Sequence, residues 1–274
     1  MGSTQQAVDV GLINSASRLR TVPPNSSDDS IDLAGMRVGY GVRADEESTG
    51  ADGLAAHLDV TWLVGDPPWL ALFNRWLADV IRGGEPAGTS DAQARSMSYI
   101  EANAMVLGTV DADGHPQTRT VLCKGVDATG VVFFTGYDSA KGQALQVNPY
   151  ASATFPWINL ERQVHFRGPV SKVSPAETQA YWESRPRGSQ LSAYASAQST
   201  PIGSREELEA KAAAIAERFG GVDGSEPVAV PPTWGGYRID PRVVEFWQGR
   251  ADRLHNRVRA TLVDDGWLVE RLQP

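Results

Sequence analysis

The sequence has a single cysteine, Cys123, so no disulfide can form within one chain. A reducing compartment is therefore favoured over secretion. The longest apolar runs fall far short of the roughly 20 residues that span a bilayer, and the N-terminus lacks the basic-then-apolar pattern of a secretory signal. We expect a cytoplasmic protein that does not associate with membranes.

Positive charge is in deficit as well. The 274 residues include 25 Lys and Arg against 33 Asp and Glu, which gives a formal net charge of −8. Nucleic acids and anionic membranes are bound by positive surfaces, so neither is an expected partner.

Several familiar site motifs are missing. The chain has neither a GxxxxGK(S/T) phosphate loop nor a GxSxG nucleophile elbow. Its four histidines, His57, His115, His165 and His255, are scattered, and none has a second ligand at metal-binding spacing. We therefore expect no metal site.

Composition divides the chain into two parts. Residues 1–30 are polar and end in a Pro/Ser/Asp-rich stretch, which cannot bury enough surface to offset its ordering entropy, so we expect disorder. Residues 31–274 are expected to form a single domain, because barrel folds often reach this length as one unit. Residues 83–102 within it are expected to be a loop that can hold a short helix.

Capping residues and apolar spacing predict the helices. The first is expected to begin at Asp66, which can cap it, with prolines in its first turn. Glu177, three residues after Ser174, completes a capping box for another. The predicted helices cover about 66–82, 139–147, 174–185 and 204–219.

Alternating apolar residues between turn-forming Asp/Gly runs predict many strands. They cover about 104–110, 117–124, 131–135, 152–157, 163–173, 236–239, 243–248, 257–263 and 267–272. Antiparallel strands with a few inserted helices indicate a mainly β fold of the α+β type, built on a β-barrel.

Basic residues recur inside the apolar strands and beside glycines. Arg119 and Lys124 flank a predicted strand core, and Arg185 and Arg187 flank a proline. A basic residue in a strand costs desolvation unless it meets an anion. Each one alone could lie on a solvated strand face, but the whole set favours an anionic ligand.

Two spacings suggest a phosphate or another polar ligand. Arg253, His255 and Arg257 are two apart, so an extended chain would point all three to one face; an exposed edge strand is the alternative. Tyr181 and Arg185 share a helix face, and Ser189 follows, a combination that suits a phosphate monoester.

Six ordered motifs carry a resemblance to a known family. The chain resembles the pyridoxine/pyridoxamine 5′-phosphate oxidases from about residue 36 to the C-terminus. The motifs are Phe155-Pro156-Trp157, Glu161-Arg162-Gln163-Val164, Ser184-Arg185-Pro186-Arg187-Gly188-Ser189-Gln190, Trp234-Gly235-Gly236-Tyr237-Arg238, Phe246-Trp247-Gln248-Gly249 and Arg253-Leu254-His255-Asn256-Arg257.

The resemblance implies a six-stranded-type antiparallel split β-barrel that binds FMN between the subunits of a homodimer. It implies oxidation of pyridoxamine or pyridoxine 5′-phosphate to pyridoxal 5′-phosphate, with O2 as the final acceptor and H2O2 as a product, in vitamin B6 metabolism. By position, the implied FMN contacts are Arg119, Thr120, Val121, Leu122, Cys123, Lys124, Phe134, Thr135, Ser139, Lys141, Gln163, Gln198, Ser199, Trp247 and Arg257.

The substrate contacts are implied in the same way. Arg253 and His255 would lie against the pyridine ring as the catalytic residues, and His255 is the best-placed candidate for a general base. Arg37 and Tyr40 resemble the family's N-terminal lid. The full implied set is Arg37, Tyr40, Lys124, Tyr181, Arg185, Ser189, Arg253 and His255.

The sequence departs from the family pattern at two implied site positions. Ala140 stands where many members have arginine, so one contact to the flavin phosphate is missing, and Phe134 replaces a frequent tyrosine. Arg119 and Lys124 are an odd number of residues apart, so a bulge, a strand end or backbone contacts must intervene if both meet ligand.

Two other functions are also compatible with the sequence. One is a split-barrel reductase that uses a flavin, a deazaflavin or a nicotinamide without oxygen. The other is a non-catalytic carrier of pyridoxal phosphate or flavin.

Overall fold

The computed structural model describes residues 57–82 and 101–274. The expected disorder of 1–30, the lid residues Arg37 and Tyr40, and nearly all of the expected loop at 83–102 lie outside these ranges. Among the described residues, no helix is both long and apolar enough to cross a membrane.

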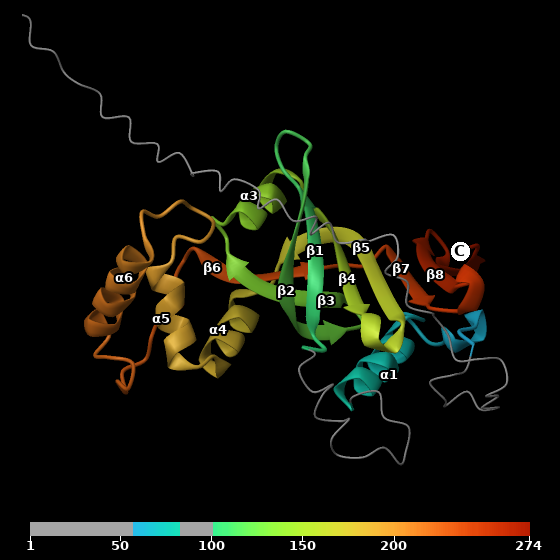
Figure 1. The fold of residues 1–274 in the computed structure, drawn as a ribbon, viewed down its shortest axis with the longest axis horizontal. Coiled ribbons are helices and arrows are strands. Elements are labelled where there is room, and N and C mark those ends of the chain that lie inside the picture. The colour runs from blue at the N-terminus through green and yellow to red at the C-terminus, as the bar shows by residue number, and fades with distance from the viewer. Residues whose placement is uncertain (1–56, 83–100) are drawn as a thin grey trace, which may run out of the picture. The chain divides into compact units, whose positions relative to one another are not determined.

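A six-stranded antiparallel barrel forms the centre of the fold (Figure 1). Each strand pairs with the next in the order β1, β2, β3, β6, β5, β4, and β4 closes the barrel by pairing with β1. The strands are β1 (Ala104–Val110), β2 (Pro116–Asp127), β3 (Gly130–Gly136), β4 (Tyr150–Trp157), β5 (Arg162–Lys172) and β6 (Trp234–Ile239). The predicted split-barrel fold is confirmed.

Strand β5 is the point at which the barrel splits. Its second half, Val170–Lys172, pairs with β6, whereas its first half, Arg162–Arg167, pairs with β7 (Val243–Gln248). From there β8 (Asn256–Val263) and β9 (Gly266–Leu272) continue the sheet outside the barrel.

Helix α1 (Leu70–Ile81) packs its buried aromatic side chains on β4 and β5. The Phe73 ring lies 5.0 Å from that of Phe155 and 5.3 Å from that of Phe166. The predicted start at Asp66 is wrong: the helix begins at Leu70 and has no side-chain cap. A residue before proline avoids the α region, so two consecutive prolines delay the first turn.

An ion pair fixes α1 to the start of β5. Arg162, only 3% exposed, lies with Nη1 2.7 Å from Asp79 and with its guanidinium 4.7 Å from the Trp76 ring centre. A buried charge of this kind is tolerated because it is both paired and stacked. The contact sets the position of Gln163, the next residue along β5.

Three helices form what we call the helical lobe: α4 (Pro175–Ser184), α5 (Arg187–Ala195) and α6 (Arg205–Arg218). Its core is separate from that of the barrel, and its buried members are Trp182, Leu191, Val228 and Trp234. In Figure 1 the lobe lies beyond one side of the barrel, and β7 and β8 lie beyond the other. The capping box predicted at Ser174 and Glu177 is present, but α5 was not predicted.

The expectation that Arg253, His255 and Arg257 share one strand face is wrong. Arg253 ends a short 3-10 helix, η3 (Ala251–Arg253), and both Asp252 and Arg253 have positive φ, 54° and 61°. Left-handed backbone breaks the extended alternation that the spacing argument needed. Only Arg257 of the three lies within β8.

Candidate active site

A cavity of about 600 Å³ lies between the barrel and the helical lobe. We call it the basic pocket, and nearly all of the residues that line it were predicted from the sequence as FMN or substrate contacts. They are Arg119, Thr120, Val121, Leu122, Lys124, Phe134, Thr135, Lys141, Tyr181, Arg185, Pro186, Ser189 and Gln198. Pro186 is the one member that the sequence prediction did not assign a contact.

A β-bulge explains how Arg119 and Lys124 both reach the pocket. The register of β2 against β3 shifts between Cys123 and Gly125, which inserts Lys124 as the extra residue. A residue inserted at a bulge departs from the regular alternation of faces, so the odd spacing from Arg119 no longer requires the two side chains to lie on opposite faces. The side chain of Cys123 is instead buried in the barrel core, and its thiol contacts the carbonyl of Gly125.

Lys141 is the most deeply buried cation of the pocket. Its side chain is 7% exposed, and Nζ lies 3.2 Å from Thr135 Oγ1 and 3.5 Å from Ser139 Oγ. Burial, and then the charge of Arg119, lower the pKa of the Lys141 amine below its usual value. Neither described hydroxyl partner carries a charge, so an anion would relieve this site.

Ser139 places Lys141 by capping α3 (Ala140–Val147), the helix that the sequence predicted over 139–147. Its Oγ accepts from the Gly142 amide and lies at the start of the helix. Arg119 is held on the other side by Thr109 Oγ1 at 2.7 Å and Gln117 Oε1 at 3.2 Å. The two cations therefore converge from β2 and α3 without a carboxylate among the described lining residues.

Arg185 is held in an aromatic cage at the lobe side of the pocket. Its guanidinium carbon lies 4.8 Å from the Trp234 ring centre and 6.0 Å from that of Tyr181. One amino group donates to the Ser189 carbonyl at 2.8 Å, while Nε is buried without a hydrogen-bond partner. A guanidinium with a buried, unsatisfied N–H, in a pocket that three other cations line, is the pattern expected of an anion receptor.

Phe134 packs against Tyr181 and Trp234, two of the rings near Arg185. Its ring stacks on Tyr181 at 3.9 Å and on Trp234 at 5.5 Å, so β3, α4 and β6 each contribute one ring. The role of Trp234 was missed as a site contact, although the sequence placed it in a family motif. Its proximity follows from the register of β3 against β6, which the sequence alone does not define.

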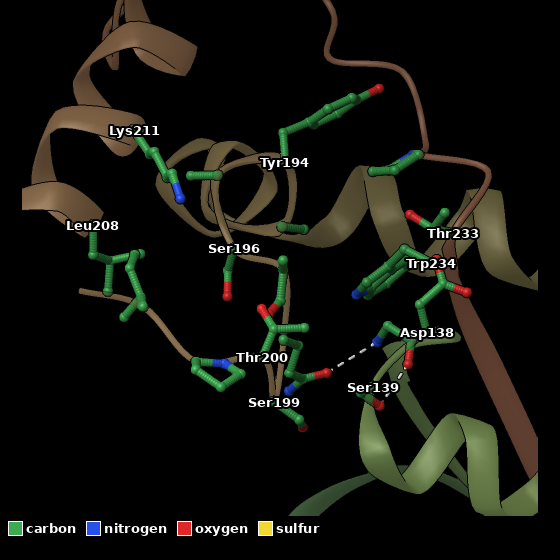
Figure 2. Close-up of a pocket in the computed structure, with 18 of the residues that line it drawn as sticks. Asp138, Ser139, Tyr194, Ser196, Ser199, Thr200, Leu208, Lys211, Thr233 and Trp234 are labelled. Atoms are coloured by element: carbon green, nitrogen blue, oxygen red, sulfur yellow. Dashed lines mark hydrogen bonds between the residues drawn. The ribbon is translucent and has the colours of Figure 1, made fainter. Parts of the chain in front are cut away.

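Figure 2 shows a second cavity, of about 710 Å³. Gln198 lines both this cavity and the basic pocket. Ser139 and Ser199, both predicted FMN contacts, line this second cavity. Gln198 Oε1 accepts from Thr135 Oγ1 at 2.9 Å and from the Gly136 amide at 3.2 Å. Ser199 has a positive φ of 72°, a strained conformation for a residue other than glycine.

The remaining predicted contacts form a second group, which we call the β7–β8 cluster. None of them lines the basic pocket. Gln163 pairs across β5 and β7 with Trp247, and Trp247 pairs across β7 and β8 with Arg257. The His255 ring lies 4.7 Å from the Trp247 ring. The cluster consists of Gln163, Trp247, Arg253, His255 and Arg257.

Arg257 is oriented by a carboxylate. Its Nη2 lies 2.7 Å from Glu245, and its Nη1 donates to the Gln273 carbonyl. The Glu245 hydrogen bond raises the pKa of the guanidinium, so Arg257 stays charged and fixed in direction.

The tautomer of His255 follows from one hydrogen bond. The backbone N–H of Arg250 donates to His255 Nδ1 at 3.1 Å. Nδ1 is therefore an acceptor, and the proton of the neutral ring lies on Nε2. In this tautomer Nε2 carries the proton, and the general-base role of His255 stays a prediction.

His57 and Leu58 form hydrogen bonds with residues that are next to the β7–β8 cluster in sequence. Gln248 Oε1 accepts from the Leu58 amide at 2.8 Å and from Asn256 Nδ2 at 3.0 Å. The His57 ring contacts Arg250 Nη2 at 2.9 Å. These contacts hold the turn that carries Arg253 and His255.

One histidine does lie near carboxylates, contrary to the sequence expectation. Ligand atoms of Asp111, Asp113 and His115 lie within 4.8 Å of one another in the β1–β2 turn. Asp111 Oδ1 already accepts from the backbone N–H groups of Asp113 and His115. The grouping is explained by the hydrogen bonds of the turn.

Comparison with known proteins identifies the family. Residues 92–219 match the pyridoxamine 5′-phosphate oxidase family model, and residues 234–274 match the pyridoxine 5′-phosphate oxidase C-terminal dimerisation region. The chain is 53% identical over 254 residues to the pyridoxine/pyridoxamine 5′-phosphate oxidase of Mycolicibacterium smegmatis, covering 92% of this chain and 97% of that protein. The chain belongs to the pyridoxine/pyridoxamine 5′-phosphate oxidase family.

Other relatives of this oxidase-family chain agree. The pyridoxine/pyridoxamine 5′-phosphate oxidase of Mycobacterium tuberculosis is 52% identical over 246 residues, with 90% of this chain and 96% of that protein covered. Among solved structures, PhzG from Burkholderia lata, in complex with tetrahydrophenazine-1-carboxylic acid, has a TM-score of 0.62 at 29% identity. That comparison covers 74% of this chain and 91% of PhzG.

Proposed function

We propose that this chain oxidises pyridoxamine 5′-phosphate, pyridoxine 5′-phosphate or both to pyridoxal 5′-phosphate with bound FMN. With the amine as substrate, one O2 and one water are consumed, and ammonia and H2O2 are released. The observation that carries the proposal is the basic pocket, in which four cations from two structural units converge.

The pocket residues fit a flavin phosphate and a second phosphate. Arg119 and the buried Lys141 lie with Thr135 and Gln198 on the barrel side. Lys124, Tyr181, Arg185 and Ser189 come from β2 and the lobe. Two groups of cations in one cavity suit two anions, because a single phosphate would leave part of the charge unpaired.

The residues of the basic pocket and of the β7–β8 cluster act mainly by positioning the substrate. FMN, when bound, supplies the acceptor for the substrate's hydride and passes the electrons to O2. Lys124, Tyr181 and Arg185 hold the substrate phosphate and so fix the distance of the reacting carbon. Arg253 and His255 hold the pyridine ring, with His255 donating a hydrogen bond from Nε2.

We propose that each site is completed by the β7–β8 cluster of a second copy of the chain. Within one chain the cluster and the basic pocket are built on different strands and share no lining residue. The match of residues 234–274 to a dimerisation region supports a homodimer. Two-fold symmetry would give two equivalent sites, each with a pocket from one chain and a cluster from the other.

The visible spectrum of the purified protein tests this function. A flavin spectrum that bleaches when pyridoxamine 5′-phosphate is added without oxygen, followed by H2O2 release in air, is the expected result. Bleaching that persists in air without peroxide would support the reductase alternative. A spectrum that the substrate does not change would support the carrier.

Ala140→Arg should strengthen FMN binding. Ala140 is exposed at the start of α3, next to the Ser139 cap and one residue before Lys141. A guanidinium there can add a charge-assisted hydrogen bond to the flavin phosphate, which we expect to lower the FMN Kd by about tenfold. Flavin fluorescence titration of the apoprotein measures the Kd, with Ala140→Gln as the uncharged control. An unchanged Kd for Ala140→Arg would contradict the placement of the flavin phosphate at this helix.

A further inference from the structure

The Arg187 guanidinium donates hydrogen bonds to three backbone carbonyls. Nε donates to the Gly221 carbonyl at 3.0 Å, Nη1 donates to the carbonyl of Glu226, and Nη2 donates to that of Phe219. All three acceptors lie at or after the end of α6. Arg187 does not line the basic pocket, although the sequence places it in the same motif as Arg185 and Ser189.

These bonds fix a helix that is otherwise weakly held. No residue of α6 is buried, and Ile215, Ala216 and Phe219 pack only partly buried against the small lobe core. A cation that binds the C-cap carbonyl and carbonyls just after a helix satisfies acceptors that the helix itself leaves without a partner. Arg187 therefore joins the C-terminal end of α6 to the first residue of α5.

The two proposed phosphate contacts lie on either side of Arg187, at the junction of α4 and α5. Arg185 lies two residues before Arg187, and Ser189 lies two residues after it; Pro186 between them is part of the pocket lining. Arg185 also donates to the Ser189 carbonyl, so the turn is one connected unit. A shift of α5 relative to α6 would move both pocket residues together.

We propose that Arg187 is a positioning residue for the substrate phosphate. It holds the α4–α5 junction in the conformation in which Arg185 and Ser189 both face the basic pocket. The inference rests on the proposed function, in which these two residues bind that phosphate. It assigns Arg187 no contact with substrate or flavin.

We expect the loss of Arg187 to raise KM and to leave kcat nearly unchanged. Arg187→Met keeps most of the side-chain length but removes all three donors. We expect the KM for pyridoxamine 5′-phosphate to rise about tenfold while kcat at saturation changes by less than about twofold, because substrate holding is weakened and the reacting groups are unchanged. FMN content should stay normal, since Lys141 and Arg119 belong to α3 and β2.

A second variant perturbs the same contact from the other side. A methyl group on Gly224 would lie 2.6 Å from the Gly220 carbonyl oxygen and 2.9 Å from Arg187 Nη2. Gly224→Ala should therefore give the same KM effect in a milder form. Arg187→Lys retains the charge but donates from a single nitrogen, so it should replace only part of the contact to the three carbonyls and partly restore the KM. Arg205→Met removes an exposed pair with Glu209 on the same helix and serves as the unchanged control.

The test combines steady-state kinetics with inorganic phosphate binding to the FMN-loaded protein by calorimetry. Weaker phosphate binding and a raised KM in Arg187→Met and Gly224→Ala, with normal flavin content, are expected. An unchanged KM and phosphate Kd, or a parallel loss of kcat and flavin, would overturn the role of Arg187. If the wild-type protein released no peroxide, the proposed function would fail, while phosphate binding would still test the position of Arg187.

Discussion

Lys141→Met should weaken FMN binding roughly a hundredfold and at the same time raise the melting temperature of the apoprotein. The first effect is the loss of about 3 kcal/mol of charge-assisted interaction with an anion in a desolvated site. The second follows because the apoprotein buries an ammonium group whose hydrogen-bond partners are two uncharged hydroxyl oxygens, those of Thr135 and Ser139. A substitution that stabilises the apoprotein but weakens FMN binding indicates that the original side chain serves the ligand and not the fold.

The pH dependence of the apoprotein provides a second measurement. The pKa of Lys141 is lowered in the folded state by burial and by Arg119. The unfolded chain therefore binds more protons between the folded and unfolded pKa values, and stability rises with pH across that window. Denaturant unfolding at several pH values should show this rise in wild-type apoprotein and a smaller one in Lys141→Met. If the variant retained normal flavin affinity, the phosphate assignment would be wrong.

Arg253→Met and Arg257→Met should damage the enzyme in different ways. We expect Arg253→Met to lower kcat/KM by roughly two orders of magnitude, equivalent to about 3 kcal/mol of transition-state interaction, with flavin content near normal. Arg257→Met should release flavin, and excess FMN should partly restore activity by mass action. The structure favours this separation, because Arg257 is fixed within β8 by Glu245 and Arg253 projects from the preceding turn.

Flavin absorbance per protomer after dialysis, paired with kinetics at saturating FMN, distinguishes the two roles. His255→Asn should resemble Arg253→Met in a milder form, since the amide keeps a hydrogen-bond donor. Equal loss of flavin in Arg253→Met and Arg257→Met would instead make the cluster a single anion-binding or structural unit.

The strands could be predicted because their burial alternates with period two. In β1, for example, Met105, Leu107 and Thr109 face inward, and the predicted bounds 104–110 are those observed. Helix α5 could not be predicted in the same way, since Pro186 and Gly188 at its start suggested a loop. Leu191 and Tyr194, three residues apart and both in contact with the lobe core, were the available signal.

The positions of the site residues were harder to predict from spacing along the chain than the strands and helices were. The family resemblance supplied its residues, but spacing alone put Arg253 on a strand face, and the left-handed backbone at Asp252 and Arg253 overrides that pattern. The bulge at Lys124 was one of the options left open by the odd spacing from Arg119. The contact of Trp234 with Arg185 joins β6 to the end of α4, and no spacing along the chain reports such a contact.

The central claim is that each active site combines the basic pocket of one chain with the β7–β8 cluster of another. Hybrid dimers test it most directly. Arg185→Met removes a pocket residue, and Arg253→Met removes a cluster residue; differently tagged chains can be co-expressed and the heterodimer isolated by tandem affinity. In that heterodimer one site would carry both changes and the other neither, so its activity should be about half that of a wild-type dimer. Activity no higher than that of the two parent variants would contradict a site shared between chains.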